Sequence, residues 1–295
     1  MGLDLVDRTV GLIGLGQMGS GIAANLLRAG YDLLGYDLRS EALDRLTAMG
    51  GRNARDAPDL VARSHVVLTC VEGKDAIRLA DEVLLQEARP GQVFVDHSTI
   101  PVPQAQRIGQ AFVARGCGYL DAPISGGKEG AAAGTLRVFV GGDRALADAL
   151  WPLFEAIGNP DKIVYCGPIG MGQAAKVVQQ LTHRFPDVAR MEVMAFGLLA
   201  GLDLETVRRA LDVDPSSDEP YARLYRAVRD GETDNLSGLF SEWAYYLEAA
   251  DAMGFEMPML RAMYEFCEDG PETGLDPLGR PQPSIWNELL RQRKS

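Results

Sequence analysis

The first half of the chain alternates short apolar runs with segments of helical periodicity. The apolar runs have the length of buried parallel strands and lie at residues 9–15, 32–37, 65–71, 93–96, 118–121 and 136–140. Between the first two runs, apolar residues at helical spacing extend from Met18 to Ala29 and stop before Gly30. This alternation predicts a doubly wound α/β domain.

The pattern changes after about Gly167, where strand signals give way to long amphipathic stretches. These lie at residues 173–200, 204–211, 221–228, 240–253 and 259–267. We therefore predict two domains, an α/β domain over residues 1–167 and an all-α domain over residues 168–295. Pro186 predicts a kink or break near Arg184 and Phe185. The proline-containing tail after Gly270 predicts an extended arm that ends in a short helix at 286–291.

Composition narrows the class of protein. Hydrophobic residues make up 46% of the 295 residues and charged residues 24%, and no apolar run approaches the roughly 20 residues of a membrane span. The first residues do not resemble a secretory signal, so we expect a cytoplasmic protein with no membrane partner. Four scattered cysteines and three histidines argue against a metal site, and the net charge of −12 argues against nucleic acid as a partner.

A glycine-rich fingerprint follows the first predicted strand. Gly14, Gly16 and Gly19 have the G-x-G-x-x-G spacing of a turn that leads onto a helix, with Gln17 and Met18 between the last two glycines. Asp37 ends the second strand, where a carboxylate can bind both ribose hydroxyls and repel a 2′-phosphate. The pattern predicts a Rossmann domain that binds NAD in preference to NADP. Arg39 leaves NADP open, although an exposed loop arginine is more often solvated.

The segment Asp121-Ala-Pro-Ile-Ser-Gly-Gly127 has no hydrophobic periodicity. One interpretation is a rigid turn, since proline and glycine are ordinary turn formers. The other is an anion pocket in which the Ser125 hydroxyl and the amides of Gly126 and Gly127 bind a carboxylate. The spacing alone does not separate the two.

Three more motifs accompany these, Asp96-His-Ser-Thr99, Gly134-Thr-Leu136 and Gly170-x-Gly172-x-x-x-Lys176. With all the motifs in this order, the chain resembles the β-hydroxyacid dehydrogenase family, which includes 3-hydroxyisobutyrate dehydrogenase, tartronate semialdehyde reductase and relatives of 6-phosphogluconate dehydrogenase. The resemblance implies that a helical domain supplies a catalytic lysine and the contacts of a homodimer or homotetramer. It also implies that Val71 and Thr99 lie against the cofactor and that the turn from Ser125 to Gly127 binds substrate.

Lys176 is the candidate general acid–base. Hydride transfer from an alcohol carbon leaves a proton on the oxygen, and a lysine amine within reach can remove it. The alternative is a solvated surface lysine, but a cation at the start of a helix opposes the helix dipole.

The chain also departs from the family pattern. Gln179 stands where similar proteins carry Asn, so the amide that would orient the substrate hydroxyl is one methylene longer. Ser241 and Glu242 replace a Lys-Asp pair, and His183 and Arg184 lie in a segment where small or apolar residues are common.

These features predict an NAD-dependent dehydrogenase or reductase that interconverts a small β-hydroxy acid and its semialdehyde or keto form. Two alternatives stay open at this point. The departures also suit a reductase of imines or larger aldehydes, and the fold is shared by noncatalytic dinucleotide-binding proteins.

Overall fold

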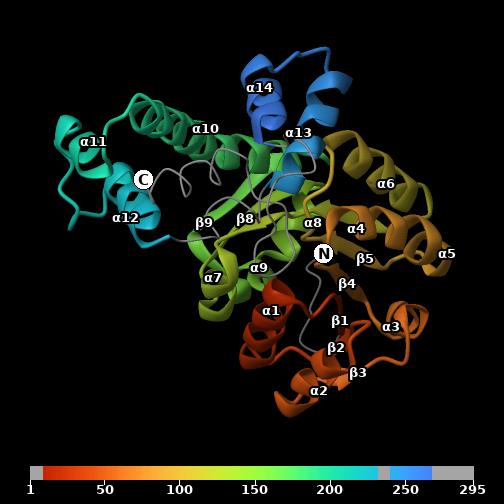
Figure 1. Cartoon of the computed structure of the whole chain (residues 1–295). Helices are drawn as coiled ribbons and strands as arrows, with labels where there is room; N and C mark the ends of the chain where they lie inside the picture. The colour runs from red at the N-terminus through yellow and green to blue at the C-terminus, as the bar shows by residue number, and fades with distance from the viewer. Residues whose placement is uncertain (1–8, 232–239, 268–295) are drawn as a thin grey trace. The chain divides into compact units, whose positions relative to one another are not determined.

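The computed structural model describes residues 9–231 and 240–267 (Figure 1). Its contacts divide the chain into two compact units, Met1–Val177 and Val178–Ser295. The division after residue 167 that the sequence suggests lies earlier in the chain and stays a prediction. The predicted arm and helix after Gly270 lie outside the described residues.

The first unit is built around a sheet of nine strands within residues 9–167, in the order β3-β2-β1-β4-β5-β6-β8-β7, with β9 beside β8. The strands from β3 to β6 in this order are parallel, whereas β8 runs antiparallel to β6 and β7 and parallel to β9. Their bounds are β1 Val10–Ile13, β2 Leu33–Tyr36, β3 Arg52–Asn53, β4 Val66–Thr69, β5 Val93–Asp96, β6 Gly118–Asp121, β7 Ile124–Ser125, β8 Leu136–Gly142 and β9 Gly158–Gly167.

The central strands are buried on both faces, which explains their uninterrupted apolar runs. Successive side chains enter different cores, since Leu68 packs with one cluster and Val67 with the other. The first core includes α1 Gln17–Arg28, α2 Ser40–Ala48, α7 Gly127–Ala133, α8 Arg144–Ala149 and α9 Trp151–Ile157. The second includes α3 Ala57–Arg63, α4 Gly73–Leu79, η1 Ala80–Leu84, α5 Leu85–Glu87 and α6 Val102–Ala114. The predicted doubly wound α/β domain is confirmed.

Three strands were not predicted from the hydrophobic pattern. β3 and β7 have two residues each, too few for a periodic signal. β9 pairs only with β8, and most of its residues are exposed or half-buried. An edge strand of this kind needs no apolar run, so hydrophobic patterning does not find it.

The second unit is helical, and residues 178–231 and 240–267 contain no strand. Its helices are α11 Leu204–Ala210, α12 Pro220–Asp230, α13 Phe240–Ala252 and α14 Pro258–Cys267, together with most of α10 Met171–Leu199, which begins in the first unit. These bounds confirm the predicted all-α second domain.

The predicted break near Arg184 and Phe185 does not occur, because α10 continues from Met171 to Leu199 with Pro186 inside it. The alternative, a kink at this point, stays a prediction. Proline removes one backbone donor, here the amide that would bond the Thr182 carbonyl. The turns that follow bury Val188, Met191 and Met194, and this burial stabilises the helix beyond the proline.

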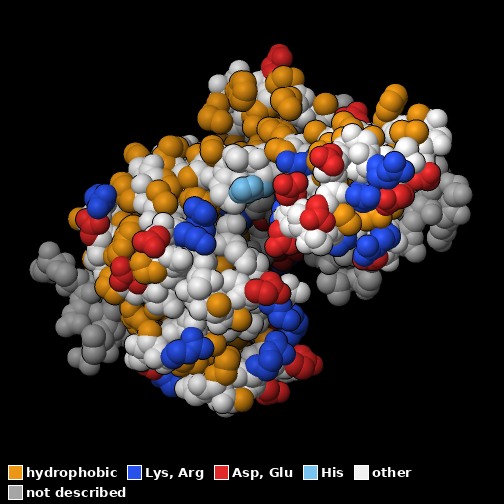
Figure 2. Space-filling model, turned by 90° about the vertical axis from the view of Figure 1, so that its left-hand side faces the viewer, with side chains coloured by type: hydrophobic (Ala, Val, Ile, Leu, Met, Phe, Trp, Pro, Cys, Tyr) orange, Lys and Arg blue, Asp and Glu red, His pale blue; other side chains and the backbone are white. Residues whose placement is uncertain are grey.

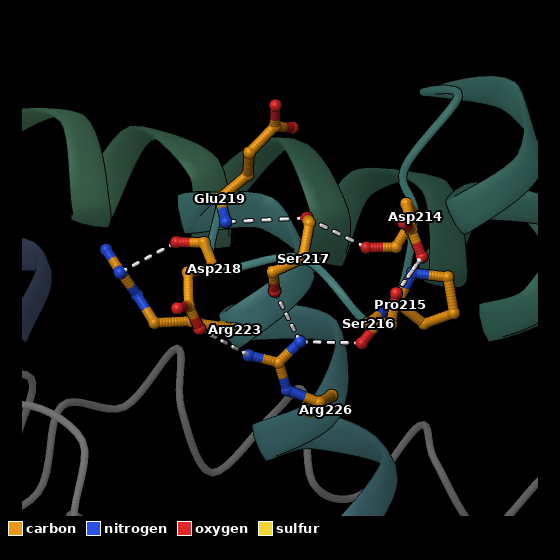
Figure 3. A network of polar contacts seen from close by, with 8 residues as sticks. All are labelled: Asp214, Pro215, Ser216, Ser217, Asp218, Glu219, Arg223 and Arg226. Atoms are coloured by element: carbon orange, nitrogen blue, oxygen red, sulfur yellow. Dashed lines mark hydrogen bonds and ion pairs between the residues drawn. The ribbon is translucent and has the colours of Figure 1, made fainter.

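Polar contacts hold the turn between α11 and α12 (Figure 3). Arg226 donates from Nη1 to the carbonyl oxygens of Pro215 and Ser217, both at 2.6 Å. Asp214 accepts from the backbone amide of Ser216 at 2.8 Å. Because these bonds satisfy backbone groups of the turn, they hold it between the two helices.

Charged side chains of both signs are mixed on the surface. On the face drawn in Figure 2, Lys and Arg side chains are scattered among Asp and Glu, without one continuous positive patch. No helix in the described ranges is long and apolar enough to cross a membrane.

Candidate functional site

Each of the three fingerprint glycines has a different structural role. Gly14 has φ +93°, and a Cβ there would lie 2.3 Å from the Cys70 carbonyl oxygen. At Gly19 a Cβ would lie 1.9 Å from the Gly14 carbonyl oxygen, so only glycine lets α1 approach the turn. Gly16 faces open space, with Arg39 Nη2 at 3.7 Å as the nearest atom. A ligand can therefore approach the backbone at Gly16 closely.

The N-terminus of α1 is suited to a phosphate group. Gly16 is its N-cap residue, and the first turn carries no acidic side chain. Gln17 is exposed, while Met18 is half-buried and packs against the first core. The free amides and the positive end of the helix dipole both favour an anion here.

Asp37 lies just beyond β2 with its carboxylate 8% exposed. Its Oδ2 accepts from the Leu15 amide at 2.7 Å, which ties the carboxylate to the glycine turn. Burial alone would raise the pKa of Asp37, but hydrogen bonds from Arg39 and Leu15 outweigh it and lower the pKa. The side chain is therefore ionised at neutral pH, as recognition of a ribose diol requires.

Arg39 is not the solvated loop arginine that we expected. Its Nε donates to Asp37 Oδ1 at 3.0 Å and its Nη2 to Asp37 Oδ2 at 3.2 Å. The guanidinium is 59% exposed, so the pair is partly screened by water. The positive guanidinium partly offsets the negative charge of Asp37. The pair therefore repels a 2′-phosphate less than a lone carboxylate would.

A cavity of about 540 Å³ opens beside these residues, a size typical of small-molecule sites. Gly14, Asp37, Arg39 and Val71 contribute to its walls. The glycine backbone and the Asp37 carboxylate in these walls match the diphosphate and ribose of a dinucleotide, so the residues fit NAD.

Replacing Asp37 by Ala is expected to reduce the preference for NADH over NADPH by about 10- to 100-fold, because it removes both hydrogen bonding to the ribose and repulsion of the 2′-phosphate. Titration of intrinsic fluorescence with each cofactor measures the two dissociation constants. Asp32→Ala is the control, because Asp32 pairs with Arg52 rather than Arg39. Tighter binding of NADPH than NADH by the wild type would contradict this role.

Polar contacts join the ends of β4 and β5. Thr69 Oγ1 and the Ser98 amide both donate to Asp96 Oδ1, at 2.7 and 2.9 Å. The Val71 amide donates to Ser98 Oγ at 3.2 Å. Thr99 follows directly and is half-buried. The structure thus brings the turns of Val71 and Thr99 together at the carboxyl edge of the sheet.

His97 is buried beside them. Its Nδ1 lies 2.7 Å from the Ala122 carbonyl oxygen. Burial lowers the pKa of His97 to about 4, so the ring is neutral at physiological pH. A neutral ring bonded to a backbone carbonyl is a packing element, which leaves Lys176 as the stronger candidate for proton transfer.

Asp121, which the sequence did not single out as a site residue, ends β6 at the first turn of α10. Its Oδ1 accepts from the Gly170 amide at 2.7 Å and its Oδ2 from the Gln173 amide at 2.9 Å. A carboxylate at a helix N-terminus satisfies amides that lack a partner within the helix.

Lys176 is 4% exposed and lies one turn further along α10. Its Nζ donates to the Ile124 carbonyl oxygen at 2.8 Å. The next residues are half-buried Ser125 and exposed Gly126 and Gly127, whose φ angles are +143° and +64°. The structure therefore places the lysine amine beside the predicted carboxylate-binding turn. The alternative of a solvated surface lysine is therefore wrong for Lys176.

The departures from the family pattern lie in the second unit. Gln179 Oε1 is buried without a hydrogen-bond partner among the described residues. Its neighbour Gln180 donates to Glu242 Oε2 at 2.9 Å. Arg184 pairs with Asp187 at 3.4 Å, and burial lowers its pKa, whereas His183 is exposed. The side chain of Ser241 lies outside the described part of the chain.

No group of three or more His, Cys, Asp or Glu within residues 9–231 and 240–267 could hold a metal ion.

Comparison with known proteins identifies the family. Residues 9–167 match the family described as the NAD binding domain of 6-phosphogluconate dehydrogenase. The chain belongs to this family. The match confirms NAD as the cofactor and the resemblance to β-hydroxyacid dehydrogenases, and it makes the chain an oxidoreductase.

Three relatives extend the comparison. NAD-dependent L-serine dehydrogenase of Pseudomonas aeruginosa is 40% identical over 203 residues, or 68% of this chain and 67% of the relative. 2-(Hydroxymethyl)glutarate dehydrogenase of Eubacterium barkeri is 27% identical over 95% of each chain. The solved structure of Mycobacterium tuberculosis 3-hydroxyisobutyrate dehydrogenase with L-serine has a TM-score of 0.78 and 26% identity, and the alignment covers 97% of this chain and 99% of that one.

Proposed function

We propose that this chain is an NAD-dependent dehydrogenase that interconverts a small β-hydroxy acid and the corresponding semialdehyde or keto acid, with Lys176 as general acid–base. The observation that carries the proposal is the buried Nζ of Lys176, 2.8 Å from the Ile124 carbonyl oxygen and next to Ser125 in the chain. An amine in this position can reach a hydroxyl on a substrate whose carboxylate binds the adjacent turn.

Each residue of the candidate site has a separate role in this reaction. The Ser125 hydroxyl and the amides of Gly126 and Gly127 bind the substrate carboxylate, which orients the substrate. Lys176 removes the hydroxyl proton during oxidation and returns it during reduction. The glycine turn and Asp37 would hold NAD, which would supply the hydride acceptor for the carbon that carries the hydroxyl. Gln179 hydrogen-bonds the hydroxyl and directs it towards Lys176.

The relatives' names support a particular substrate class. L-Serine, 3-hydroxyisobutyrate and 2-(hydroxymethyl)glutarate share a hydroxymethyl group on the carbon next to a carboxylate, and they differ in the third substituent. We place the substrate of this chain in that class. The shared part is what the turn and Lys176 are suited to bind.

Turnover of a panel tests the proposal. The panel contains L-serine, 3-hydroxyisobutyrate, tartronate semialdehyde and 2-(hydroxymethyl)glutarate, each with NAD(H) and NADP(H), and it adds a cyclic imine and a bulky aldehyde. Oxidation of a hydroxymethyl carboxylate, or reduction of the matching semialdehyde, supports the proposal. If only the imine or the bulky aldehyde is reduced, the chain is instead a reductase of imines or larger aldehydes. NADH binding without turnover would favour a noncatalytic protein.

The longer amide of Gln179 is expected to disfavour the smallest acids. It moves the hydrogen-bonding group by about one C–C bond, and a misplacement of about 1 Å can cost around 10²-fold in rate. We expect weak wild-type activity on 3-hydroxyisobutyrate and tartronate semialdehyde, and a larger kcat/KM for a bulkier member of the class. Gln179→Asn should raise kcat/KM on the small acids about 10-fold or more.

Gln180→Asn is the control for that experiment, because the Gln180 amide bonds Glu242 in the second unit. Wild-type kcat/KM of about 10⁴ M⁻¹s⁻¹ or more on either small acid would show that the substitution is neutral.

A cytoplasmic homodimer or homotetramer completes the proposal. Several apolar side chains of α10 are exposed, with Val178 at 69%, Phe196 at 76% and Leu199 at 61%. An apolar helix face of this kind favours contact with a second copy of the chain. Light scattering on the purified protein measures the assembly, and a monomer at micromolar concentration would contradict it.

A further inference from the structure

We infer that Asp121 is a positioning residue, which holds the first turn of α10 against the end of β6 and so sets the place of Lys176. This inference rests on the proposed function for its kinetic readout.

The contacts of Asp121 are those of a buried helix anchor. Its residue is fully buried, and its two carboxylate oxygens accept from two amides of the same helix start, Gly170 and Gln173. These bonds stabilise the positive end of the α10 dipole. The three helix N-caps Asp56, Asp143 and Asp203 each accept from the amide three residues on, but none of the three is buried. Among these caps, only Asp121 leads to the helix that carries the candidate catalytic lysine.

Two glycines make room for this anchor. A Cβ at Gly141 of β8 would lie 2.5 Å from Asp121 Oδ1. A Cβ at Gly172 would lie 2.3 Å from the Phe139 carbonyl oxygen and 2.7 Å from that of Asp121. Any larger residue at either position would push the carboxylate or the helix away. The glycine spacing before Lys176 thus reflects the close approach of α10 to the sheet.

The next strand, β7, contacts the helix one turn later. Ile124, three residues after Asp121, supplies the carbonyl oxygen that accepts from Lys176 Nζ. The Gln173 side chain adds a third attachment, since its Nε2 donates to the Ser98 carbonyl at 2.9 Å and its Oε1 accepts from the Ile100 amide at 3.2 Å. The first turn of α10 is therefore attached on both sides of Thr99 and at Asp121.

The charged surroundings of Asp121 make the anchor sensitive to pH. Asp96 is its register partner on β5, Tyr119 lies on the same strand, Cys166 lies on β9, and Lys176 lies on α10. Burial raises the pKa of Asp121 to about 7, against the two α10 amides that lower it, and Asp96 raises it further. A protonated carboxyl keeps one good acceptor oxygen, so it holds the helix through one strong bond instead of two.

Asp121→Asn tests the inference, because the amide has a similar shape and only one acceptor oxygen. We expect kcat to fall about 10- to 100-fold above pH 7, while KM and the NADH dissociation constant stay within about 3-fold, since the lysine is displaced but the binding groups remain. Asp143→Asn is the matched control, because Asp143 caps α8 through one bond to the Leu146 amide. It should retain wild-type kcat.

The pH profile separates positioning from a merely structural role. In the reduction direction at saturating NADH, a lysine general acid alone favours low pH. Protonation of Asp121 should instead lower wild-type kcat as pH falls through about 7, and Asp121→Asn should lack this acid limb. The inference is wrong if Asp121→Asn has the same kcat as the wild type. It is also wrong if the kcat of the variant still falls as the pH decreases through about 7. If that variant does not fold, a wild-type profile without the acid limb overturns it equally.

Thermal unfolding gives a readout without turnover. The unfolded carboxyl loses its proton near pH 4 and the folded one near pH 7, so the stability contributed by Asp121 decreases as pH rises between these values. The Tm of the wild type minus that of Asp121→Asn should therefore be larger at pH 5 than at pH 8, by about 5 °C. If the Tm difference changes with pH in this way but the protein turns over no substrate of the panel, only the proposed function is contradicted. Equal Tm values for the wild type and Asp121→Asn at both pH values contradict the inference about Asp121.

Discussion

Replacing Lys176 by Ala is expected to lower kcat about 10²–10⁴-fold, the range for loss of a general acid–base group. The amine lies beside the turn at Ser125 and donates to the Ile124 carbonyl oxygen. Steady-state kinetics on the best substrate of the panel measures the effect. NADH binding should change by less than about 3-fold, because the glycine turn and Asp37 are untouched.

Lys162→Ala is the control for this experiment, since Lys162 is an exposed lysine of β9 in the same unit. It should keep wild-type kcat and the wild-type dissociation constant for NADH. Near-wild-type turnover by Lys176→Ala would refute the acid–base role. Equal losses in kcat and in NADH binding would indicate a folding defect rather than lost proton transfer.

Alanine at Gly19 and at Gly16 should have opposite consequences. At Gly19 the new Cβ meets the Gly14 carbonyl oxygen at 1.9 Å, so α1 or the turn must move. Overpacking of this kind costs about 1–3 kcal/mol of unfolding free energy. At Gly16 the backbone has φ −68°, which alanine adopts, and the Cβ has open space. Gly16→Ala should therefore fold normally but weaken NADH binding about 10-fold or more, because the methyl group occupies the approach of the diphosphate.

The two variants serve as controls for each other. Chemical denaturation measures the free energy of unfolding of each, and fluorescence titration measures NADH binding. A destabilised Gly16→Ala, or a Gly16→Ala that binds NADH normally, would contradict the assignment of the loop as the diphosphate site.

Much of the fold could be predicted because its signals are local. β1, β2, β4, β5, β6 and β8 are apolar runs buried on both faces or nearly so, and α12 and α14 of the second unit have strong 3.6-residue periodicity. β9 and the continuous helix through Pro186 could not be predicted in this way. An exposed edge strand has no apolar signature, and the cost of a proline is outweighed by packing that becomes visible only when the helix is in place.

For the candidate site, the sequence alone predicted the glycine turn, Asp37 and Lys176, because G-x-G-x-x-G after a strand, an acidic residue at the end of the next strand and a lysine after G-x-G are patterns along the chain. Only the tertiary structure decided that Arg39 folds onto Asp37, that Lys176 lies at Ile124, and that Asp121 anchors α10. The last two contacts join residues about 50 positions apart, at 52 and 49. Such contacts depend on which strand ends the sheet order brings together, and a linear pattern of residues does not contain that order.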